Sequence, residues 1–324
     1  MTAVALVGTG MWGPRLAAAA ERAGLRLVTC FSRDDERRGE FAERFSCQAA
    51  ASFEDAIGHP EVGGVILATP NDVHAEQALA CAERGRHVFV EKPIADTTEA
   101  GERMREACET AGVTLMVGHA FRRLGAARRA KELVDEGALG RVVLAEANFS
   151  LPGKLGPQAW RYYRDRNPGG PLMQLGIHHV DTLAHLLGPV RRSSGRFAHV
   201  HTQAEIDDVG VVVLEFQSGA LGSVTGSYVS PKTFDIRLFG TDAVIEYRTD
   251  MSVWPDAEKM DPATTLTLSG SRVEFDERDM LAEELAEFGR CIRGEAEPET
   301  GADEGIAALR VVLDAVASGA EVAA

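Results

Sequence analysis

The stretch from Val88 to Pro93 reads Val-Phe-Val-Glu-Lys-Pro and places a carboxylate beside an ammonium at the end of an apolar run. The run has the β-branched and aromatic residues that favour strands, and Pro93 cannot continue a sheet. In an open α/β sheet, ligands bind outside the carboxyl ends of the strands, so Glu91 and Lys92 are expected to face a binding crevice. A salt pair on the surface at a strand end is the alternative for so short a motif.

A second strand-like run, Ala3 to Val7, leads directly into Gly8-Thr9-Gly10-Met11-Trp12-Gly13. A G-x-G-x-x-G sequence between a strand and a helix is typical of a dinucleotide-binding turn. The first glycine allows the turn, the second allows the pyrophosphate to approach, and the third allows close helix packing. Pro14 fits the first turn of the following helix, where its missing N–H is no loss. The motif therefore predicts NAD or NADP as the cofactor.

The strand expected over Arg26 to Phe31 ends in Ser32, at the distance from the glycine motif where an acid usually binds the ribose. A small hydroxyl followed by Arg33, with Arg37 and Arg38 a turn later, favours a 2′-phosphate and hence NADP over NAD. Alternatively, the arginines form a solvated helix face. Asp34 or Asp35 is then the acid that binds the ribose.

The hydrophobic pattern changes character near residue 122. Up to that point, strand-like runs at 62–68, 88–90 and 113–117 alternate with helices expected from Val73 or His74 to Gly85 and over 97–111. This alternation predicts a right-handed parallel sheet. Beyond it, a helix at 126–136 precedes strand-like runs at 142–149, 209–217, 221–228, 233–240, 243–247 and 266–268, which are typical of an antiparallel sheet. Two apolar helices, 281–292 and 303–318, are expected to close the structure.

Length, charge and cysteine content narrow the possible classes. A chain of 324 residues suits two domains, and a net charge of −15 argues against nucleic acid or an anionic membrane surface as partner. No apolar run approaches the roughly 20 residues of a membrane span, and the N-terminus lacks the basic region of a signal peptide, so a cytoplasmic protein is expected. The five cysteines are scattered without a CxxC pair, which indicates reduced thiols and neither a disulfide framework nor a zinc site.

Six segments together resemble the glucose-fructose oxidoreductase, inositol dehydrogenase and MocA (Gfo/Idh/MocA) family of NAD(P)-dependent oxidoreductases. The resemblance covers nearly the whole chain, and the order and spacing of the segments make it specific. Its carriers are the glycine motif, Thr69-Pro70-Asn71-Asp72-Val73-His74, Glu91-Lys92-Pro93, Gly118 to Arg122, Gly137 to Val142, and Gly169 to Asp181.

The resemblance implies an α/β fold in two domains. An N-terminal Rossmann domain is expected over residues 1–121. A C-terminal α+β domain with a large open, mostly antiparallel sheet is expected over 122–324, for substrate binding and oligomerisation. Its final helices are expected to pack back toward the first domain. The implied activity is hydride transfer between nicotinamide C4 and a hydroxyl or keto carbon of a sugar, a sugar derivative or a cyclitol.

Hydride transfer needs a proton acceptor and positive charge near the developing oxyanion. By resemblance, Lys92 corresponds to the family's active-site lysine and His178 to its catalytic histidine. A flexible ammonium can stabilise an alkoxide, and an imidazole titrates near neutrality. His179 and His185 are expected to be packed on a helix.

Gln174 departs from the family, whose dehydrogenases often have an aspartate at this position. An amide can hydrogen-bond a sugar hydroxyl but cannot act as a base, which leaves Lys92, His178 or a nearby tyrosine, Tyr162 or Tyr163, for acid/base chemistry. Asp181 has the alternative role of orienting His178 or an adjacent helix. The expected substrate contacts are Arg122, Trp160, Arg161, Tyr163, Gln174 and Asp181. The expected cofactor contacts are Gly8, Thr9, Gly10, Met11, Trp12, Ser32, Arg33, Arg37, Thr69, Pro70, Asn71, His74, Glu91 and Lys92.

Other functions compete with a simple dehydrogenase. A metal site at His178, His179, Asp181 and His185 is disfavoured, because adjacent helical residues point apart and hydride transfer needs no metal. An enzyme that retains its cofactor through elimination or epimerisation, and a regulatory protein that senses the cofactor without catalysis, are the two alternatives. An open sheet would expose a large apolar face on a monomer, so a homodimer or homotetramer is expected.

Overall fold

The computed structural model describes residues 1–153 and 155–320, which form two compact units. The first unit contains Met1–His119 together with Leu281–Ile306. The second contains Ala120–Met280 together with the described residues from Ala307 onward. None of the helices in these ranges is both long and apolar enough to cross a membrane.

The first unit is built on a six-stranded parallel sheet with the order β3-β2-β1-β4-β5-β6. This arrangement confirms the predicted Rossmann sheet. A strand of two exposed residues was not predicted, because it has no apolar pattern to reveal it. The strands are β1 (Ala3–Val7), β2 (Arg26–Phe31), β3 (Gln48–Ala49), β4 (Gly64–Leu67), β5 (His87–Glu91) and β6 (Leu115–Gly118).

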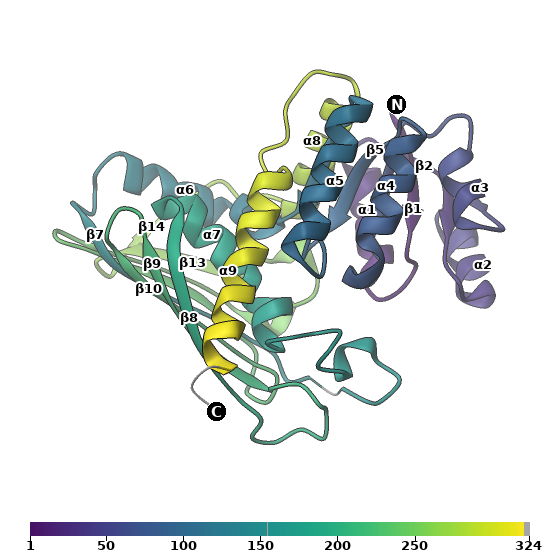
Figure 1. The fold of residues 1–324 in the computed structure, drawn as a ribbon. Coiled ribbons are helices and arrows are strands. Elements are labelled where there is room, and N and C mark those ends of the chain that lie inside the picture. The colour runs from purple at the N-terminus through teal and green to yellow at the C-terminus, as the bar shows by residue number, and fades with distance from the viewer. Residues whose placement is uncertain (154, 321–324) are drawn as a thin grey trace. The chain divides into compact units, whose positions relative to one another are not determined.

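Helices connect these strands, and several begin at a side-chain cap. The side chains of Asp34, Ser52 and Thr97 each accept a hydrogen bond from the backbone N–H three residues on, which satisfies one of the donors exposed at a helix start. Helices α4 and α5 lie side by side (Figure 1). The connecting helices are α1 (Gly13–Arg22), α2 (Asp35–Arg44), α3 (Phe53–Gly58), α4 (His74–Glu83) and α5 (Thr98–Ala111), and α8 (Met280–Ile292) joins them from later in the chain.

Helix α8 packs against the sheet although it lies far along the chain. The ring of Phe288 lies 5.8 Å from that of Phe89 in β5, between centroids. Gly64 of β4 makes room for the helix, since a Cβ there would lie 2.6 Å from Cδ1 of Ile292. A segment close to the C-terminus thus completes the core of the first unit.

The second unit is built on an eight-stranded sheet with the order β14-β13-β12-β11-β7-β10-β9-β8. Only β7 and β10 pair in parallel, so the predicted, mostly antiparallel sheet is confirmed. Strand β8 was not predicted, because most of its residues are polar and it lies at the sheet edge. The strands are β7 (Val142–Ser150), β8 (Val190–Ala198), β9 (Val209–Phe216), β10 (Leu221–Ser227), β11 (Thr233–Gly240), β12 (Val244–Thr249), β13 (Thr264–Leu268) and β14 (Ser271–Val273).

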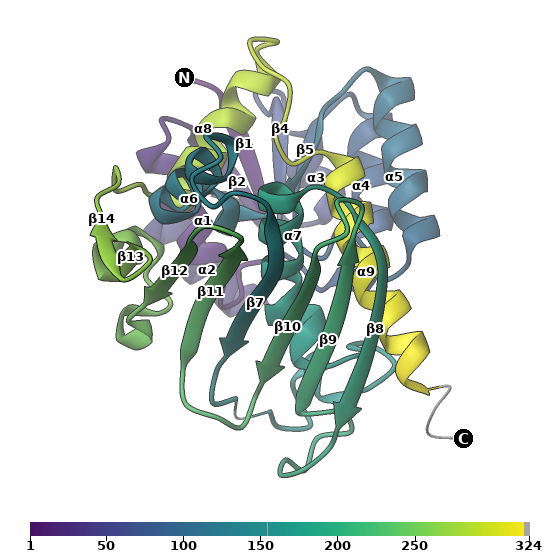
Figure 2. The ribbon, with the colours of Figure 1, turned by 90° about the vertical axis from the view of Figure 1, so that its left-hand side faces the viewer.

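Figure 2 shows this sheet with β8, β9, β10, β7, β11 and β12 side by side. Helices cover one of its two faces. They are α6 (Gly125–Asp135), α7 (Ile177–Leu187) and the second part of α9 (Ala302–Ala320). Ser193 of β8 donates to the Val311 carbonyl of α9 over 2.8 Å. Apolar side chains with 37 to 49% of their surface exposed remain on β7, β9 and β10, namely Val143, Leu144, Val211, Val213 and Leu221.

Candidate active site

The glycine turn between β1 and α1 shows which glycines the backbone itself requires. Gly8 has a φ of +101°, and a Cβ there would lie 2.4 Å from the Ala68 carbonyl oxygen. A Cβ on Gly13 would lie 2.3 Å from the Gly8 carbonyl oxygen. Around Gly10, by contrast, no heavy atom of the described protein lies within 4 Å of a built Cβ. The second glycine therefore leaves open space at the start of α1, which fits the approach of a pyrophosphate.

The end of β2 meets the glycine turn through two hydroxyls. Thr9 donates to the Ser32 hydroxyl over 2.8 Å, and Ser32 donates to the Asp34 carbonyl over 3.1 Å. Asp34 caps α2 and its carboxylate lies 3.4 Å from the Arg37 guanidinium. Arg33 is exposed beside them. The structure thus brings together four of the residues expected at the adenosine ribose.

Arg38 has a different place from its neighbours. Its guanidinium donates to the Ser32 carbonyl over 2.9 Å and lies 2.9 Å from the Asp35 carboxylate. Only 16% of its side chain is exposed. Arg38 therefore anchors the end of β2 to α2.

At the end of β4, His74 joins two turns. Nδ1 of His74 lies 3.1 Å from the Pro93 carbonyl oxygen, and Nε2 lies 2.9 Å from the Thr69 carbonyl oxygen. Burial lowers the pKa of His74, an effect that the nearby carbonyls oppose. Because its ring is buried and faces two carbonyls, His74 holds the cofactor-side turns in place, and the expected direct contact with cofactor stays a prediction.

Asn71 is the other buried polar residue of this turn. It is 3% exposed, and within residues 1–153 and 155–320 its Oδ1 has no hydrogen-bond partner. A buried amide oxygen without a partner costs free energy unless something else binds it. Asn71 therefore fits a role in holding a ligand at the end of β4. Thr69 itself donates to Gln77 over 2.6 Å.

Glu91 links the end of β5 to the glycine turn. The indole N–H of Trp12 donates to Oε1 of Glu91 over 2.6 Å, and the Glu91 side chain is buried. Lys92 follows directly, half-buried, and its peptide bond to Pro93 is cis. The glycine motif and the Glu-Lys-Pro motif, 79 residues apart at this contact, thus form one edge of the first unit.

In the second unit, His178 lies on the first turn of α7. A π-helical turn, η4 (Leu172–Gly176), precedes α7, so α-helical spacing does not define the faces around Gln174. The His178 ring lies 4.3 Å from the ring of Phe121, between centroids, and is 5% exposed. An i, i+4 relation would place Gln174 and His178 on one face of an α-helix, but the π-helical turn means that this spacing does not apply here.

His179 is packed among aromatic rings. It is fully buried, and its ring centroid lies 4.7 Å from that of Phe234. Burial lowers the pKa of His179 to about 4, although a hydrogen bond with the Asn148 backbone acts to raise it. The imidazole is therefore neutral at physiological pH and belongs to the core.

Arg161, Asn167 and Gln174 form a hydrogen-bonded cluster. Arg161 donates from Nε to Oε1 of Gln174 over 3.2 Å, and Nε2 of Gln174 donates to Oδ1 of Asn167 over 3.3 Å. Asn167 returns a hydrogen bond to the Arg161 carbonyl. Trp160 lies under the Arg161 guanidinium at 4.5 Å, and Tyr163 donates to the Pro157 carbonyl over 2.8 Å.

Asn167 and Tyr228 were not predicted as part of this cluster. Burial raises the pKa of Tyr228 to about 12, although the charge of Arg161 and a hydrogen bond with Asn167 oppose it. Asn167 lies two residues before Gly169 to Asp181, the segment that carried the resemblance, and this closeness was the available signal. Tyr228 follows the last residue of β10, and nothing local in the sequence separates it from other strand-end aromatics.

Arg122 and Asp181 lie together inside the second unit. The guanidinium donates to both carboxylate oxygens, over 2.9 and 2.5 Å, and the side chains are 6% and 3% exposed. The pair joins the short helix η2 (Ala120–Arg123) to α7. Because Asp181 lies on α7 and Arg122 on η2, this geometry supports the alternative in which Asp181 orients an adjacent helix. Among the described residues, no group of three or more His, Cys, Asp or Glu side chains is arranged to hold a metal ion.

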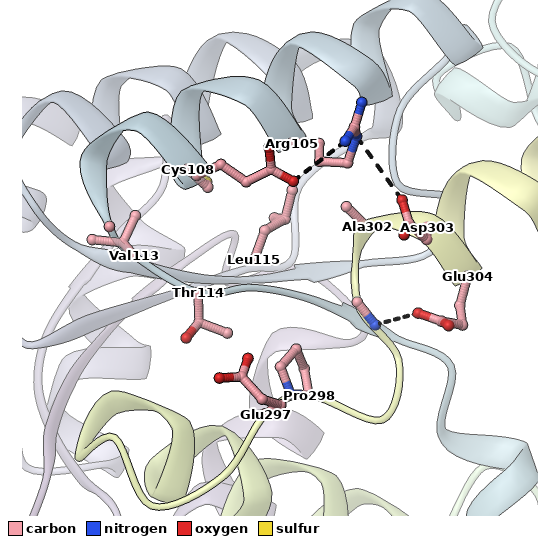
Figure 3. A pocket seen from close by; sticks show the side chains of 13 residues that line it. Arg105, Cys108, Val113, Thr114, Leu115, Glu297, Pro298, Ala302, Asp303 and Glu304 are labelled. Carbon is pink, nitrogen blue, oxygen red and sulfur yellow. Dashed lines mark hydrogen bonds and ion pairs between the residues drawn. The ribbon is translucent and has the colours of Figure 1, made fainter.

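A separate pocket of about 470 Å³ opens in the first unit between α5, the start of β6 and residues 297–304 (Figure 3). The Arg105 guanidinium beside it lies 3.3 Å from the Glu109 carboxylate and 3.9 Å from that of Asp303. None of the predicted site residues lines this pocket. It lies at the amino end of β6, whereas the cofactor-side residues follow the carboxyl ends of β1, β2, β4 and β5.

Comparison with known protein families finds one family model that matches the first unit and another that matches the second. Residues 2–119 match the model of an oxidoreductase family with an NAD-binding Rossmann fold, and residues 127–246 match the model of the GFO/IDH/MocA C-terminal domain. The chain is 28% identical to 1,5-anhydro-D-fructose reductase of Ensifer adhaerens, over 92% of this chain and 90% of the relative.

Two further proteins are similar over nearly the whole length. D-xylose 1-dehydrogenase (NADP(+)) 2 of Haloferax volcanii is 31% identical over 90% of this chain and 89% of its own. The crystal structure of a proposed NADPH-dependent oxidoreductase from Desulfitobacterium hafniense has a TM-score of 0.94 at 36% identity, covering 99% of this chain and 96% of that one. The glycine turn, the strand-end contacts and these matches agree, and the chain belongs to the Gfo/Idh/MocA family of oxidoreductases with an NAD(P)-binding Rossmann domain.

Proposed function

We propose that this protein is an NAD(P)-dependent dehydrogenase or reductase that acts on a CH–OH or keto carbon of a sugar, sugar derivative or cyclitol. The observation that carries the proposal is the edge formed by the glycine turn and Glu-Lys-Pro, joined by the Trp12 to Glu91 hydrogen bond. Relatives named as a sugar reductase and a sugar dehydrogenase support the substrate class. The domain over residues 1–121 binds cofactor in this proposal, and that over 122–324 binds substrate.

Lys92 and His178 divide the chemistry in this proposal. The bound cofactor supplies the hydride-accepting or hydride-donating carbon. Lys92 places positive charge where the substrate oxygen becomes an oxyanion, and His178 exchanges the proton of the hydroxyl. Glu91 positions the lysine-bearing turn, because its carboxylate is held by Trp12.

The cluster around Gln174 is proposed to bind substrate hydroxyls. Arg161 and Gln174 offer donors and an acceptor, and Trp160 provides an apolar surface next to them, which together suit a polyol. Tyr163 is proposed to contact substrate from the same loop. Arg122 and Asp181 are proposed to act as positioning residues for α7, since each neutralises the other's charge inside the second unit.

NADP is proposed as the preferred cofactor. Ser32 stands where NAD-specific domains carry an acid, so no carboxylate at that position repels a 2′-phosphate. Arg33 is exposed next to it, and Arg37 lies on the first turn of α2. Both guanidinium groups can form the charge-assisted hydrogen bonds that recognise a phosphate.

A homodimer or homotetramer is proposed through the open sheet face. Leu221 pairs with Leu144 across the sheet, and Val211 and Val213 extend the apolar area on the neighbouring strand. Burying this area against a second copy removes it from water and covers a sheet face that is otherwise exposed.

Replacing Lys92 with alanine is expected to lower kcat by about 10²- to 10⁴-fold, because the oxyanion loses its compensating charge. The Kd of the cofactor should change little. The reaction is found by screening sugars and cyclitols for a change in nicotinamide absorbance, and Lys131→Ala on the exposed face of α6 serves as control. Near-normal kcat for Lys92→Ala would refute the assignment, and turnover without release of reduced cofactor would instead indicate a retained-cofactor mechanism.

Replacing Arg33 with alanine is expected to weaken NADP binding by about 10- to 100-fold, as the loss of a hydrogen bond between charged groups of about 1.5–3 kcal/mol implies. NAD binding should be nearly unchanged, because NAD has no 2′-phosphate. Fluorescence titration of both cofactors measures the two Kd values. Arg44→Ala, at the far end of α2, is the matched control. Equal losses for NAD and NADP would contradict a 2′-phosphate contact.

Removing only Asp181, as Asp181→Ala, is expected to destabilise the protein by about 3–5 kcal/mol, because it leaves the Arg122 guanidinium buried without its carboxylate. The double variant Arg122→Met, Asp181→Leu should recover most of this loss. Urea unfolding of the wild type, both single variants and the double variant gives the coupling energy. A KM that rises far more than kcat falls, in a fully stable Asp181→Ala, would instead assign the pair to substrate binding.

Replacing Leu221 and Val213 with glutamate is expected to shift the protein to monomers, since a two-fold interface would contain each new charge twice. Sedimentation equilibrium measures the mass of the particle. Val200→Glu, at an exposed apolar residue between β8 and β9, is the control and should leave the mass unchanged. A wild-type protein that sediments as a monomer would overturn the proposal.

A further inference from the structure

Two loops of the second unit lie against each other at Tyr162. One is the loop of residues 155–168, called here the substrate loop because it carries proposed substrate contacts. The other is the β8–β9 loop, residues 199–208. The Tyr162 hydroxyl donates to the Gln203 carbonyl over 2.6 Å, and the Tyr162 carbonyl accepts from the Glu205 N–H over 3.0 Å. The β8–β9 loop therefore holds both the side chain and the backbone of Tyr162.

A forked ion pair joins the same two loops two residues further on. Nη1 and Nη2 of Arg164 donate to the two carboxylate oxygens of Asp207, over 2.8 and 3.4 Å. The Arg164 side chain is 55% exposed and the Asp207 side chain is 16% exposed. Two hydrogen bonds between one guanidinium and one carboxylate fix an orientation as well as a distance. The pair therefore limits how far the substrate loop can move from the β8–β9 loop.

The β8–β9 loop has little freedom of its own, because it folds around the buried carboxylate of Asp208. This carboxylate accepts from the backbone N–H groups of Val200, His201 and Thr202 over 2.9, 2.9 and 2.8 Å. The Asp208 N–H donates to the carbonyl of Ala198, the last residue of β8, over 3.0 Å. Buried hydrogen bonds of this kind are costly to break, so the loop is a fixed support at the end of β8.

Gly170 shows that the β8–β9 loop also approaches the chain just after the substrate loop. Gly170 has a φ of +49°, and a Cβ there would lie 2.0 Å from the Asp207 carbonyl oxygen. The Gly170 N–H donates to the Asn167 carbonyl over 3.2 Å, and Asn167 is hydrogen-bonded to both Gln174 and Arg161. The backbone of Asp207 therefore packs where the substrate loop returns toward η4.

We propose that the β8–β9 loop positions the substrate loop for sugar binding, with Asp207 and Arg164 as the positioning residues. Tyr162 lies between Arg161 and Tyr163, so holding its backbone also holds the two neighbours that are proposed to contact the sugar. A loop that is ordered before the ligand arrives loses less entropy on binding, which strengthens binding. The inference rests on the proposed function and names residues that act through the substrate contacts.

The chemical step is expected to be independent of this pair. Lys92 and His178 lie on neither loop, so loosening the substrate loop weakens the ground state and the transition state alike. Such a loss raises KM and leaves kcat nearly unchanged. A pair that only stabilised the fold would leave both constants unchanged in a folded variant.

Hydrogen exchange of the full chain, measured by mass spectrometry, tests the contact between the loops without substrate. Arg164→Asp places a carboxylate opposite Asp207, and we expect the amides of the substrate loop to exchange about fivefold faster. Adding Asp207→Arg should return exchange toward the wild-type rate, because the charges are opposite again. Arg191→Asp is the matched control, since it reverses one charge of another exposed pair in this sheet, 2.9 Å from Glu215. It should leave the substrate loop unchanged.

Steady-state kinetics use the sugar or cyclitol that gives the largest change of nicotinamide absorbance in the screen. We expect the KM of Arg164→Asp to rise by about tenfold while kcat changes by less than about twofold. The Kd of NADPH should stay unchanged. Arg164→Lys keeps the charge but loses the fork, so its KM should rise less. The double variant Arg164→Asp, Asp207→Arg should recover most of the loss.

Wild-type exchange and a wild-type KM in Arg164→Asp would overturn the inference. A fall in kcat at unchanged KM, or an equal rise of KM in Arg191→Asp, would do the same. Should Arg164→Asp fold poorly, Arg164→Ala takes its place, and a double variant that regains stability but not KM also refutes positioning. If no sugar or cyclitol is turned over, the proposed function fails, whereas exchange still decides whether the two loops are coupled.

Discussion

The parallel register of β1, β4, β5 and β6 is the constraint on which the cofactor side of the first unit depends. Val7 pairs with Leu67, Leu67 pairs with Val90, and Glu91 pairs with Gly118, so these strands end at nearly the same level. The residues that follow each strand therefore share one edge. A slip of one residue in β5 would send the Glu91 carboxylate to the opposite face of the sheet, since side chains alternate along a strand.

Hydrogen bonds between distant residues then hold this edge together. The Glu91 carboxylate is buried, and a buried charge is tolerated only when donors surround it. The Trp12 indole supplies one such donor from the glycine turn. A hydrogen bond to a charged group stabilises a fold by about 1.5–3 kcal/mol, so the turn that is expected to bind phosphate is stabilised by the residue beside Lys92. The glycine turn and the Glu-Lys-Pro turn are linked in this way by a hydrogen bond within the protein.

Sequence patterns predicted those parts of the fold that burial makes periodic. Buried runs such as Gly64–Leu67 and alternating strands such as Thr233–Gly240 can be recognised in the sequence, because their side chains meet the core at a fixed spacing. Strand β3 and edge strand β8 gave no such signal, since their side chains are largely solvated. The π-helical turn before α7 was missed because an i→i+5 pattern extends over only Leu172–Gly176 and apolar residues there mimic an α-helix. Contacts such as Arg122 with Asp181, 59 residues apart, depend on tertiary packing that no local pattern records.

The cluster around Gln174 explains how an amide is accommodated at the position where the family resemblance implies an aspartate. Oε1 of Gln174 accepts from Arg161, a role that a carboxylate could also fill. Nε2, however, donates to Oδ1 of Asn167, and a carboxylate has no hydrogen for that bond. Since Asn167 in turn holds the Arg161 backbone, the amide is matched to its neighbours on both sides. An aspartate here would leave the Asn167 oxygen facing a carboxylate, so the neighbours of Gln174 suit an amide, which cannot act as a base.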